Sequence, residues 1–337
     1  MVKFDIPVVV FLFKRIDKTA LIIDQISKIR PLKLYLIADG PRNEEEKELV
    51  MRCRQQVEEH ITWDCEVVKN YAEKNRGVYE NIAGGAKWVF EREKYAIFLE
   101  DDNFPAISFF QFCREMLMRY EHDSRILWIC GTNYLKKYQP SDGSDYVFSR
   151  LMFPCGWASW SDKFLKFYDG ELALFADDSV RKKVLATYTN RALANQDLSY
   201  WQSEYNRKNR GERFISWDYQ MSFSIRAHSL LGIVPKNNLI KNIGVDEFSI
   251  HGGTSMTKTM TKRFCEIEID ELDFPLKHPP VCLPDPTFEK LNEKIILAPL
   301  KSRLKHKMIL LVKKILRIKS HESFRSTLKR RIGLINS

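Results

Sequence analysis

Three consecutive acidic residues, Glu100-Asp101-Asp102, directly follow an apolar run at residues 95–99 that has the length of a buried β-strand. Carboxylates held side by side at a strand end repel one another unless a cation or protein donors neutralise them. Hard divalent ions such as Mn²⁺ and Mg²⁺ take oxygen ligands and often bridge one or two carboxylates to phosphate groups. The triplet therefore predicts either a divalent-metal site or an acidic turn that caps the helix expected near Ser108. Its position after a buried strand favours the metal.

Three further candidate positions also lie beside the ends of predicted elements. Arg15 follows the first apolar run and would contact a nucleotide or remain a solvated loop charge. Asp39 follows the apolar run at residues 34–38, where it would bond to a base N–H or a ribose hydroxyl or merely stabilise an Asp-Gly turn. Arg76 and Gly77 open a predicted helix whose N-terminus suits a phosphate group, although an ordinary helix start is the alternative.

The spacing of apolar residues over 1–131 alternates between strand and helix patterns. Repeated β-α-β units predict an α/β fold with a mostly parallel central sheet and helices on both faces. In such sheets ligands bind beyond the carboxyl ends of the strands, which is where the acidic triplet and the Asp-Gly turn are placed. Over 132–178 the pattern breaks up. Helices are expected again around 179–190 and 217–228, and the Pro-rich segment 274–300 is expected to be an extended linker.

Positive charge is concentrated at the C-terminal end of the sequence. The net charge is +10, but residues 301–337 contain twelve Lys or Arg and one acid, whereas residues 1–300 are close to neutral. A nucleic-acid enzyme would more often spread its basic residues over a folded face, so we expect no nucleic-acid partner. A helix expected from about 303 to 319 has apolar residues on one side and basic residues opposite. This pattern is typical of a helix on an anionic membrane surface, and docking on the body of the protein or on a partner is the alternative.

Composition and cysteine content restrict the class of protein. With 44% hydrophobic and 29% charged residues the chain is globular, which excludes a disordered or fibrous protein. The longest apolar run, residues 6–13, is too short for a transmembrane helix, and no small-residue cleavage site follows it, so we expect no signal peptide. Seven cysteines without a Cys-x-x-Cys pair argue against a disulfide framework and a structural zinc site. We expect a cytoplasmic protein, peripheral on the inner face of the cell membrane.

Six motifs in chain order resemble nucleotide-sugar glycosyltransferases of the GT-A fold, most nearly N-acetylglucosaminyltransferase I and its bacterial relatives. The resemblance extends over residues 6–255 as short motifs and leaves the basic tail outside it. The motif at 153–157 is one residue shorter than the Phe-Pro-Gly-x-Gly-Trp of that family, and the motif at 249–252 is one residue longer than its Ser-His-Gly. The matching positions are Arg15, Asp39, the Glu-Asp-Asp of residues 100–102, Phe153-Pro154-Cys155-Gly156-Trp157, Trp217-Asp218 and Ser249-Ile250-His251-Gly252.

The resemblance implies an inverting, metal-dependent glycosyltransferase of the hexosyltransferase class. Such an enzyme would move a sugar from a UDP-sugar, with UDP-N-acetylglucosamine suggested, to a hydroxyl of a glycan or lipid-linked acceptor in bacterial cell-surface polysaccharide synthesis. Residues 1–131 would be the nucleotide-sugar-binding half of one domain, and residues 132–273 its acceptor-binding and catalytic half. The linker at 274–300 and the basic tail at 301–337 would follow, and the tail would bind an anionic membrane surface.

The resemblance also implies a role for each matched residue. Asp218 would be the catalytic base that takes the proton from the acceptor hydroxyl, although the pattern alone predicts that it stabilises its own helix behind a cap at Ser216. Asp102 would hold Mn²⁺ or Mg²⁺, and His251 would ligate the metal or contact the diphosphate unless it is an ordinary loop histidine. Trp157 and Trp217 would stack on sugar faces, although core packing is the commoner role of tryptophan. The implied donor contacts are Arg15, Asp39, Arg76, Gly77, Glu100, Asp101 and His251, and the implied acceptor contacts are Gly156, Trp157 and Trp217.

Two other classes of protein share parts of this pattern. A sugar nucleotidyltransferase uses a similar sheet and metal, but it would usually have a Gly-rich basic loop after the first strand, and residues 13–17 contain no glycine. A non-catalytic sugar-binding protein would not need intact acidic groups, and both the triplet and Asp218 are present. Release of pyrophosphate from a nucleoside triphosphate would indicate the first class. Donor hydrolysis that a chelator abolishes would exclude the second.

Overall fold

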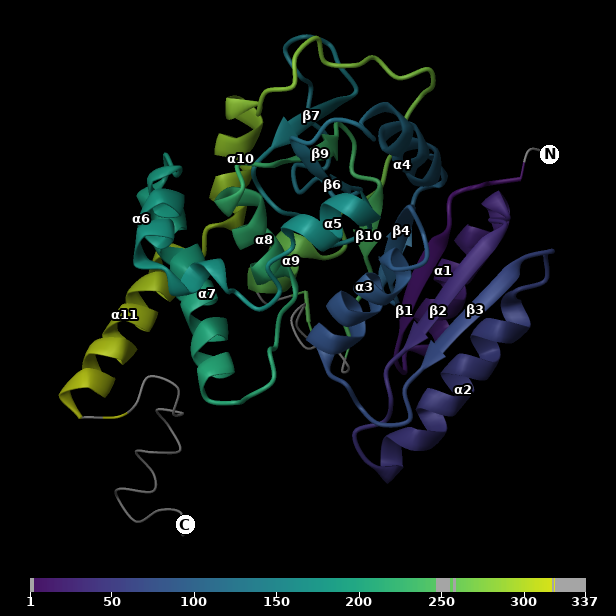
Figure 1. Ribbon diagram of the computed structural model, residues 1–337, viewed down its shortest axis with the longest axis horizontal. Helices are drawn as coiled ribbons and strands as arrows, with labels where there is room; N and C mark the ends of the chain where they lie inside the picture. The colour runs from purple at the N-terminus through teal and green to yellow at the C-terminus, as the bar shows by residue number, and fades with distance from the viewer. Residues whose placement is uncertain (1–2, 247–254, 257–258, 317, 319–337) are drawn as a thin grey trace. The chain divides into compact units, whose positions relative to one another are not determined.

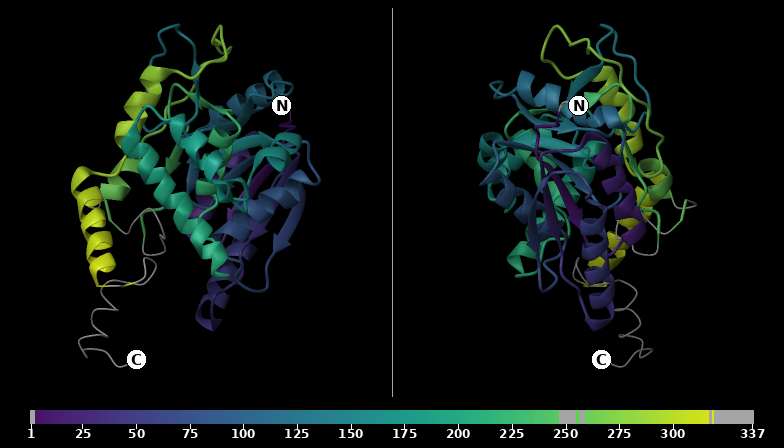
Figure 2. Two further views of the ribbon diagram at one scale, coloured as in Figure 1. Left: turned by 60° about the vertical axis from the view of Figure 1, so that its left-hand side comes forward. Right: turned by 90° about the vertical axis from the view of Figure 1, so that its right-hand side faces the viewer.

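The computed structural model describes residues 3–246, 255–256, 259–316 and 318 of the 337-residue chain. The chain divides into two compact units, Met1–Lys294 and Ile295–Ser337. The first unit contains a central β-sheet flanked by helices (Figures 1 and 2). All of the predicted site residues belong to this first unit.

The central sheet has eight strands, of which β1, β2 and β4 position the candidate site. In the order β3-β2-β1-β4-β8-β6-β9-β7, β1 pairs in parallel with both β2 and β4, whereas β8 and β7 run antiparallel to their neighbours. The predicted α/β fold with a mostly parallel sheet is therefore confirmed. The strands are β1 (Val8–Leu12), β2 (Lys33–Ala38), β3 (Glu66–Tyr71), β4 (Tyr95–Glu100), β6 (Ile126–Cys130), β7 (Tyr146–Ser149), β8 (Trp157–Trp160) and β9 (Leu231–Pro235). A smaller sheet pairs β5 (Asn103–Pro105) with β10 (Ile240–Asn242).

Helices cover both faces of the sheet, which explains why its inner strands are apolar along their whole length. On one face the side chains of Val8 and Val10 join a buried cluster with residues of α1 (Ile16–Ile29) and α4 (Ile107–Arg119). On the other face Phe98 packs against Phe90 of α3 (Gly85–Phe90), with ring centroids 5.1 Å apart. Phe90 in turn contacts Phe164 of α5 (Ser161–Phe167) at 5.0 Å.

The remaining helices follow the sequence pattern in part. The helices expected around 179–190 and 217–228 correspond to α6 (Asp178–Ala186) and α8 (Asp218–Ala227). The long helix α7 (Arg191–Asn209) was not predicted, because its many Asn, Gln and Ser residues obscure the spacing of the few that it buries. The others in the first unit are α2 (Glu44–His60), α9 (Thr259–Phe264), α10 (Pro286–Ile296), a π-helical turn at Glu80–Gly84 and a 3₁₀ turn at Leu174–Ala176.

The expectation of an extended segment over 274–300 is wrong for its second half, where α10 lies. Asp285 caps this helix, since its Oδ1 accepts hydrogen bonds from the backbone N–H groups of Thr287 and Phe288, both at 2.9 Å. Pro286 occupies the first helical position, where the missing N–H of proline costs nothing. A proline that follows a capping Asp thus marks the start of a helix. The high proline content of the segment had instead suggested an extended chain.

The second unit contains α11 (Leu300–Ile315), which corresponds to the helix expected from about 303 to 319. Its large apolar side chains are exposed, among them Leu304 at 51% and Ile315 at 70%. Among the described residues no helix combines the length and the apolar composition that a membrane span requires.

A buried lysine joins α5 to the loop after α4. The Lys163 side chain is 4% exposed, and its Nζ donates hydrogen bonds to the carbonyl oxygens of Tyr120 at 2.6 Å and Asp123 at 2.9 Å. The ammonium also lies 3.6 Å from the centroid of the Trp160 ring. Burial lowers the pKa of Lys163 to about 8, so the folded protein loses this proton well before the unfolded chain does.

We predict that Lys163→Met removes a pH dependence of stability. Between about pH 8 and pH 10.4 the unfolded chain binds one more proton at this position than the folded protein, so the free energy of unfolding rises with pH. Over that interval the wild type should gain about 2 kcal/mol relative to the variant, measured by urea unfolding at each pH. Parallel pH profiles for the two proteins would contradict the burial of this charge.

Candidate active site

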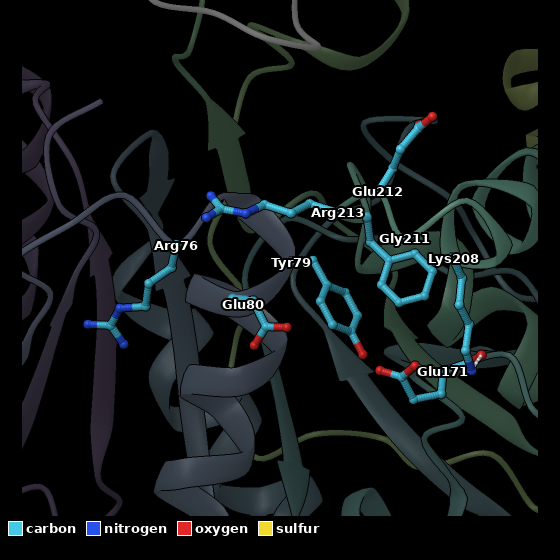
Figure 3. Close-up of a pocket in the computed structure, with 9 residues that line it drawn as sticks. Arg76, Tyr79, Glu80, Glu171, Lys208, Gly211, Glu212 and Arg213 are labelled. Carbon is cyan, nitrogen blue, oxygen red and sulfur yellow. Dashed lines mark hydrogen bonds and ion pairs between the residues drawn. The ribbon is translucent and has the colours of Figure 1, made fainter. Parts of the chain in front are cut away.

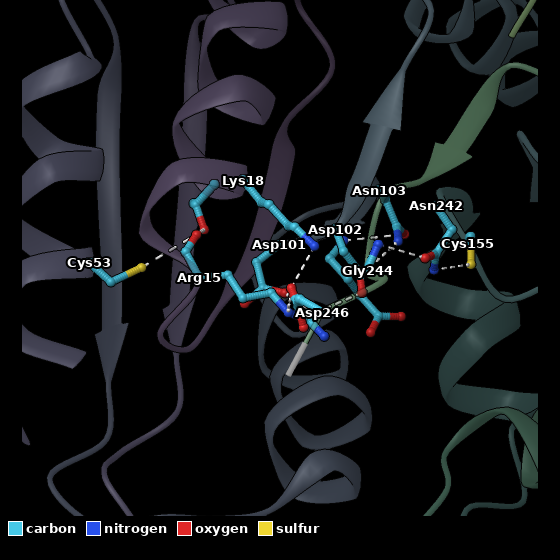
Figure 4. Close-up of polar contacts among 12 residues, drawn as sticks. Arg15, Lys18, Cys53, Asp101, Asp102, Asn103, Cys155, Asn242, Gly244 and Asp246 are labelled. Carbon is cyan, nitrogen blue, oxygen red and sulfur yellow. Dashed lines mark hydrogen bonds and ion pairs between the residues drawn. The ribbon is translucent and has the colours of Figure 1, made fainter. Parts of the chain in front are cut away.

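The acidic triplet lies at the carboxyl end of β4, next to the segment that follows β1. The parallel pairing of these strands puts Phe11 opposite Glu100, so the chain beyond each strand emerges at the same edge. There the Nη1 of Arg15 donates to Asp101 Oδ1 at 2.8 Å and to Asp102 Oδ2 at 2.7 Å (Figure 4). The predicted contact between Arg15 and a nucleotide is thus replaced, in this structure, by an ion pair with the triplet.

A distant segment completes this cluster. Arg15 Nε lies 3.3 Å from Asp246 Oδ2, and Lys18 Nζ donates to the same oxygen at 2.5 Å. Lys18 is one helical turn beyond Arg15 in α1, which places both side chains on one side of the helix. The chain before Asp246 passes close to the triplet, since the N–H of Ile243 donates to the carbonyl oxygen of Asp102 at 2.9 Å. We did not predict Lys18 or Asp246; the helical spacing could have indicated the first, and nothing local indicates the second.

The remaining carboxylate oxygen of Asp102 is held by a buried amide. Asn103, 1% exposed, donates from Nδ2 to Asp102 Oδ1 at 2.7 Å, and its Oδ1 accepts the N–H of Gly156 at 2.8 Å. A side chain on Gly244 would collide with Asp102 Oδ2. The orientation of Asp102 is therefore determined from three sides, by Arg15, by Asn103 and by the close approach of the backbone at Gly244.

Glu100 brings the triplet into electrostatic contact with Asp218. Burial raises the pKa of the Glu100 carboxyl, and nearby negative charges, including that of Asp218, raise it further. In the described part of the chain this carboxyl has no hydrogen bond or ion pair. Burial also raises the pKa of Asp101 to about 6, although Arg15 opposes the rise. Asp218, although far from the triplet in the sequence, is thus close enough for its charge to raise the pKa of Glu100.

The start of α8 positions Asp218. Ser216 caps the helix as expected, because its Oγ accepts the N–H of Tyr219 at 3.0 Å, and the same hydroxyl donates to the Asp218 carboxylate. Glu204 of α7 holds the preceding loop, since its Oε2 accepts the N–H groups of Ile215 at 2.9 Å and Ser216 at 3.3 Å. The unpredicted helix α7 therefore supplies the group that fixes the chain before Asp218.

The triplet does not cap α4, so the acidic-turn alternative is wrong. Glu271 performs that role: its two carboxylate oxygens accept the N–H of Ile107 at 3.0 Å and the N–H of Ser108 at 2.7 Å. Asp101 and Asp102 are paired instead with Arg15, which means that a cation rather than a helix end neutralises these two acids.

The donor set at the triplet fits a hard divalent cation that receives its other ligands from phosphate and water. Oxygens of Asp101 and Asp102 converge on a single position, which the Arg15 nitrogen holds in this structure. Two carboxylates with room for phosphate oxygens are the usual protein share of a Mg²⁺ or Mn²⁺ site. Among the described residues no group of three or more His, Cys, Asp or Glu side chains is placed to hold a metal ion. The predicted ligand His251 lies outside the described residues.

Asp39 has a structural role that differs from the predicted contact with a base or ribose. It is 6% exposed, and its carboxylate accepts hydrogen bonds from the backbone N–H groups of Gly40 (2.8 Å), Arg76 (2.6 Å) and Gly77 (3.1 Å) and from Asn75 Nδ2 (2.8 Å). Four donors occupy the acceptor capacity of a carboxylate. The turn alternative is therefore the one that the structure supports: Asp39 binds the start of the π-helical segment to the end of β2.

Arg76 and Gly77 take part in this clamp rather than in an open phosphate site. The Arg76 guanidinium donates to the side-chain oxygen of Asn70 at 3.0 Å and to the carbonyl oxygen of Ala38 at 3.3 Å, so it joins the ends of β2 and β3. Figure 3 shows this side chain turned away from Tyr79. Gly77 has a φ of 85°, which favours glycine over any residue with a side chain.

The predicted acceptor contacts at Gly156, Trp157 and Trp217 are wrong. Trp157 is 1% exposed and its ring stacks on Phe98, with centroids 3.9 Å apart. Trp217 is 4% exposed and packs 5.7 Å from Trp157. Gly156 is buried with a φ of 61°, and a side chain there would collide with Ile240. These residues form the aromatic core beneath the edge of the sheet, so their rings have no face available for a sugar.

Comparison with known proteins finds low similarity to several solved structures. No protein-family model matches the chain, and no curated protein matches it. A mannosyltransferase from Pyrobaculum calidifontis in complex with GDP-Man and Mn²⁺ is 11% identical, with a TM-score of 0.38 over 68% of this chain and 70% of that one. Mouse xyloside xylosyltransferase 1 is 8% identical, with a TM-score of 0.38 over 68% of this chain and 84% of that one.

A structure of another class scores almost as well. The 4-diphosphocytidyl-2C-methyl-D-erythritol synthase from Anaerococcus prevotii is 10% identical, with a TM-score of 0.33 over 58% of this chain and 85% of that one. Similarities this low carry no conclusion about the fold or the activity of this chain.

We predict that Asp39→Ala destabilises the nucleotide-free protein by about 3 kcal/mol, because three backbone N–H groups and an amide lose a buried charged acceptor. Urea unfolding measures the change. Asp142→Ala is the matched control, since Asp142 accepts the Ser144 N–H in an exposed turn and its loss should cost little. Equal stability of the two variants would restore the contact with a nucleotide as the role of Asp39.

We also predict that Arg15→Ala lowers the melting temperature in the presence of a chelator, because it leaves the triplet without its cation. Mn²⁺ should then raise the melting temperature more in this variant than in the wild type, since the ion takes the position of the guanidinium. Arg114→Ala, which removes an exposed ion pair with Asp5, is the control and should leave the response to Mn²⁺ unchanged. A response that is the same in all three proteins would place any metal elsewhere.

Proposed function

We propose that this protein is a glycosyltransferase that uses a nucleotide-sugar donor. The observation that carries the proposal is the meeting of the strand-end acids with Asp218 at the carboxyl edge of a mostly parallel sheet, which is the edge where such sheets bind ligands. Both groups required for a displacement are then at one place: acids with cations beside them for a diphosphate, and a carboxylate at a helix start for an acceptor hydroxyl.

In the proposed reaction Asp218 is the general base of a single displacement. The acceptor oxygen attacks the anomeric carbon, the bond from that carbon to the diphosphate oxygen breaks, and the hydroxyl proton passes to the Asp218 carboxylate. The hydroxyl of Ser216 orients this carboxylate at the N-terminus of α8. Attack from the face opposite the leaving group inverts the anomeric configuration.

Asp101 and Asp102 would hold Mn²⁺ or Mg²⁺, and the ion would stabilise the negative charge of the departing diphosphate. Arg15 and Lys18 would lie at the same rim, where each can donate to phosphate oxygens once it is released from Asp246. Asn103 would keep Asp102 in a single orientation throughout.

The sequence motifs that resemble nucleotide-sugar glycosyltransferases support a more specific proposal for the donor and the acceptor. The donor would be a UDP-sugar, with UDP-N-acetylglucosamine the first to test, and the acceptor a glycan or lipid-linked saccharide in the synthesis of a bacterial surface polysaccharide. Because Asp39 is occupied by protein donors, recognition of the base is assigned to other residues near this edge. His251 keeps its proposed role at the metal or the diphosphate.

We predict that Asp218→Asn reduces turnover by about 10²- to 10⁴-fold, the usual contribution of a general base, and leaves the dissociation constant of the donor within twofold. The assay is release of UDP from UDP-N-acetylglucosamine with Mn²⁺, with water as acceptor, and calorimetry measures binding. Asp178→Asn is the matched control, because Asp178 also occupies the first residue of a helix, at the surface. Near-normal turnover in Asp218→Asn would contradict the assignment, and pyrophosphate release from UTP and a sugar phosphate would indicate a nucleotidyltransferase instead.

We further propose that α11 binds the surface of an anionic membrane, where a lipid-linked acceptor would be available. Leu304, Met308, Leu311 and Ile315 follow one another at intervals of three or four residues, and each is at least half exposed. The same segment contributes most of the net positive charge of the chain. An exposed apolar stripe with basic residues around it fits a bilayer of anionic lipids. The localisation would then be peripheral on the inner face of the membrane.

We predict that Leu304→Gln combined with Leu311→Gln weakens binding to vesicles of phosphatidylglycerol and phosphatidylcholine at least tenfold, since both side chains lose their burial in lipid. Co-sedimentation measures the partition, and added salt should weaken it in the wild type. The control combines Met51→Gln with Leu165→Gln, two exposed apolar residues outside α11. Equal binding by both double variants, or by neutral vesicles, would contradict the proposal.

A further inference from the structure

A cavity of about 240 Å³ is lined by residues outside the acidic cluster and involves none of the sequence motifs assigned to the acceptor. One wall is Tyr79, in the segment that Asp39 clamps at Arg76 and Gly77. Phe214, in the loop between α7 and α8, lines the cavity next to Tyr79. Drug-sized ligands occupy pockets of about 300–1,000 Å³, so this volume suits a smaller ligand such as a single sugar ring.

The two aromatic rings form an apolar surface that a sugar ring can cover. Their centroids are 4.7 Å apart, their planes are inclined by 57°, and both residues line the cavity. Aromatic side chains supply large apolar contact area with little loss of conformational freedom. The C–H groups on one face of a pyranose ring are apolar, whereas its hydroxyl groups point outward to polar partners.

The charged residues around the cavity balance one another. Lys208 lies 3.1 Å from Glu171 Oε2, and Arg213 donates from Nη1 to the carbonyl oxygen of Asn75 at 3.0 Å (Figure 3). The lining contains as many acidic as basic residues, which is unfavourable for a phosphate or another strongly anionic ligand. Hydroxyl groups both donate and accept hydrogen bonds, so they match a rim that offers both kinds of partner.

The loop that contains Phe214 continues directly into the residues that hold Asp218. Glu204 accepts the N–H groups of Ile215 and Ser216, so the wall of the cavity and the start of α8 are fixed by the same carboxylate. Tyr168 also holds the chain just before Asp218, because its hydroxyl donates to the carbonyl oxygen of Trp217 at 3.1 Å. Phe214 thus precedes the proposed general base, Asp218, by four residues in a segment that Glu204 holds in place.

We propose that this cavity binds one neutral saccharide unit and forms the acceptor subsite. Only the assignment of this subsite to the acceptor rests on the proposed glycosyltransferase activity. Binding of a neutral sugar can be measured without turnover. It also replaces Trp157 and Trp217, which are buried, with Tyr79 and Phe214 as the aromatic residues that contact a sugar.

The test uses p-nitrophenyl glycosides of glucose, galactose, mannose and N-acetylglucosamine as probes, with glucose 6-phosphate as the anionic comparator. Binding is measured by saturation-transfer NMR and calorimetry on the full chain without a donor. Phe214→Ala should raise the dissociation constant of the bound glycoside about tenfold, and Phe214→Trp should leave it unchanged. Ile215→Ala is the matched control, because Ile215 is the exposed neighbour of Phe214 and does not line the cavity. Melting temperatures confirm that each variant is folded.

The outcomes separate this inference from the proposed function. Loss of glycoside binding in Phe214→Ala but not in Ile215→Ala supports the subsite, and it does so even if no nucleotide sugar is hydrolysed, a result that would overturn the proposed activity alone. Equal binding by all variants, no binding of any neutral glycoside, or tighter binding of glucose 6-phosphate would each overturn the subsite. If transfer is observed, an unchanged KM for acceptor in Phe214→Ala would also overturn it.

Discussion

Neighbouring carboxylates at the end of a buried strand require positive charge, and in this protein Arg15 provides it. The guanidinium reaches Asp101 and Asp102 because β1 and β4 are adjacent parallel strands whose chains leave the sheet at one edge. The same cation draws in Asp246 from a segment that follows β10. Arg15 therefore holds three parts of the chain at the rim of the sheet, and a bound metal ion with a diphosphate would have to replace that cation rather than fill an open space.

The acidic residues at this edge differ in how many hydrogen bonds each accepts from the protein. Asp39 accepts four hydrogen bonds, so its lone pairs are used within the protein and it serves as a clamp. Glu100, by contrast, has no hydrogen-bond or ion-pair partner among the described residues, and burial and the charges around it, including that of Asp218, raise the pKa of its carboxyl. Counting donors thus separates two acids that look alike at the ends of two strands.

The aromatic residues divide in a similar way. Trp157 stacks between Phe98 and Trp128, at 3.9 and 4.3 Å, and gives the core beneath the site its rigidity. The rings that border a cavity belong to Tyr79, just before the π-helical turn at Glu80–Gly84, and to Phe214, in a loop without any recognisable motif. Many folds place binding residues on loops that a rigid core holds in position.

The sequence by itself determined the fold class, the strand-end position of the acidic triplet and the cap at Ser216, because these depend on local spacing and on capping chemistry. It also determined the amphipathic character of α11. Only the tertiary structure decided that Arg15 pairs with the triplet, that Glu271 rather than the triplet caps α4, and that Asp39 and the tryptophans are occupied or buried. Each of these depends on contacts between segments far apart in the chain, and whether a polar group is saturated or a ring is covered is a property of those contacts and not of local sequence.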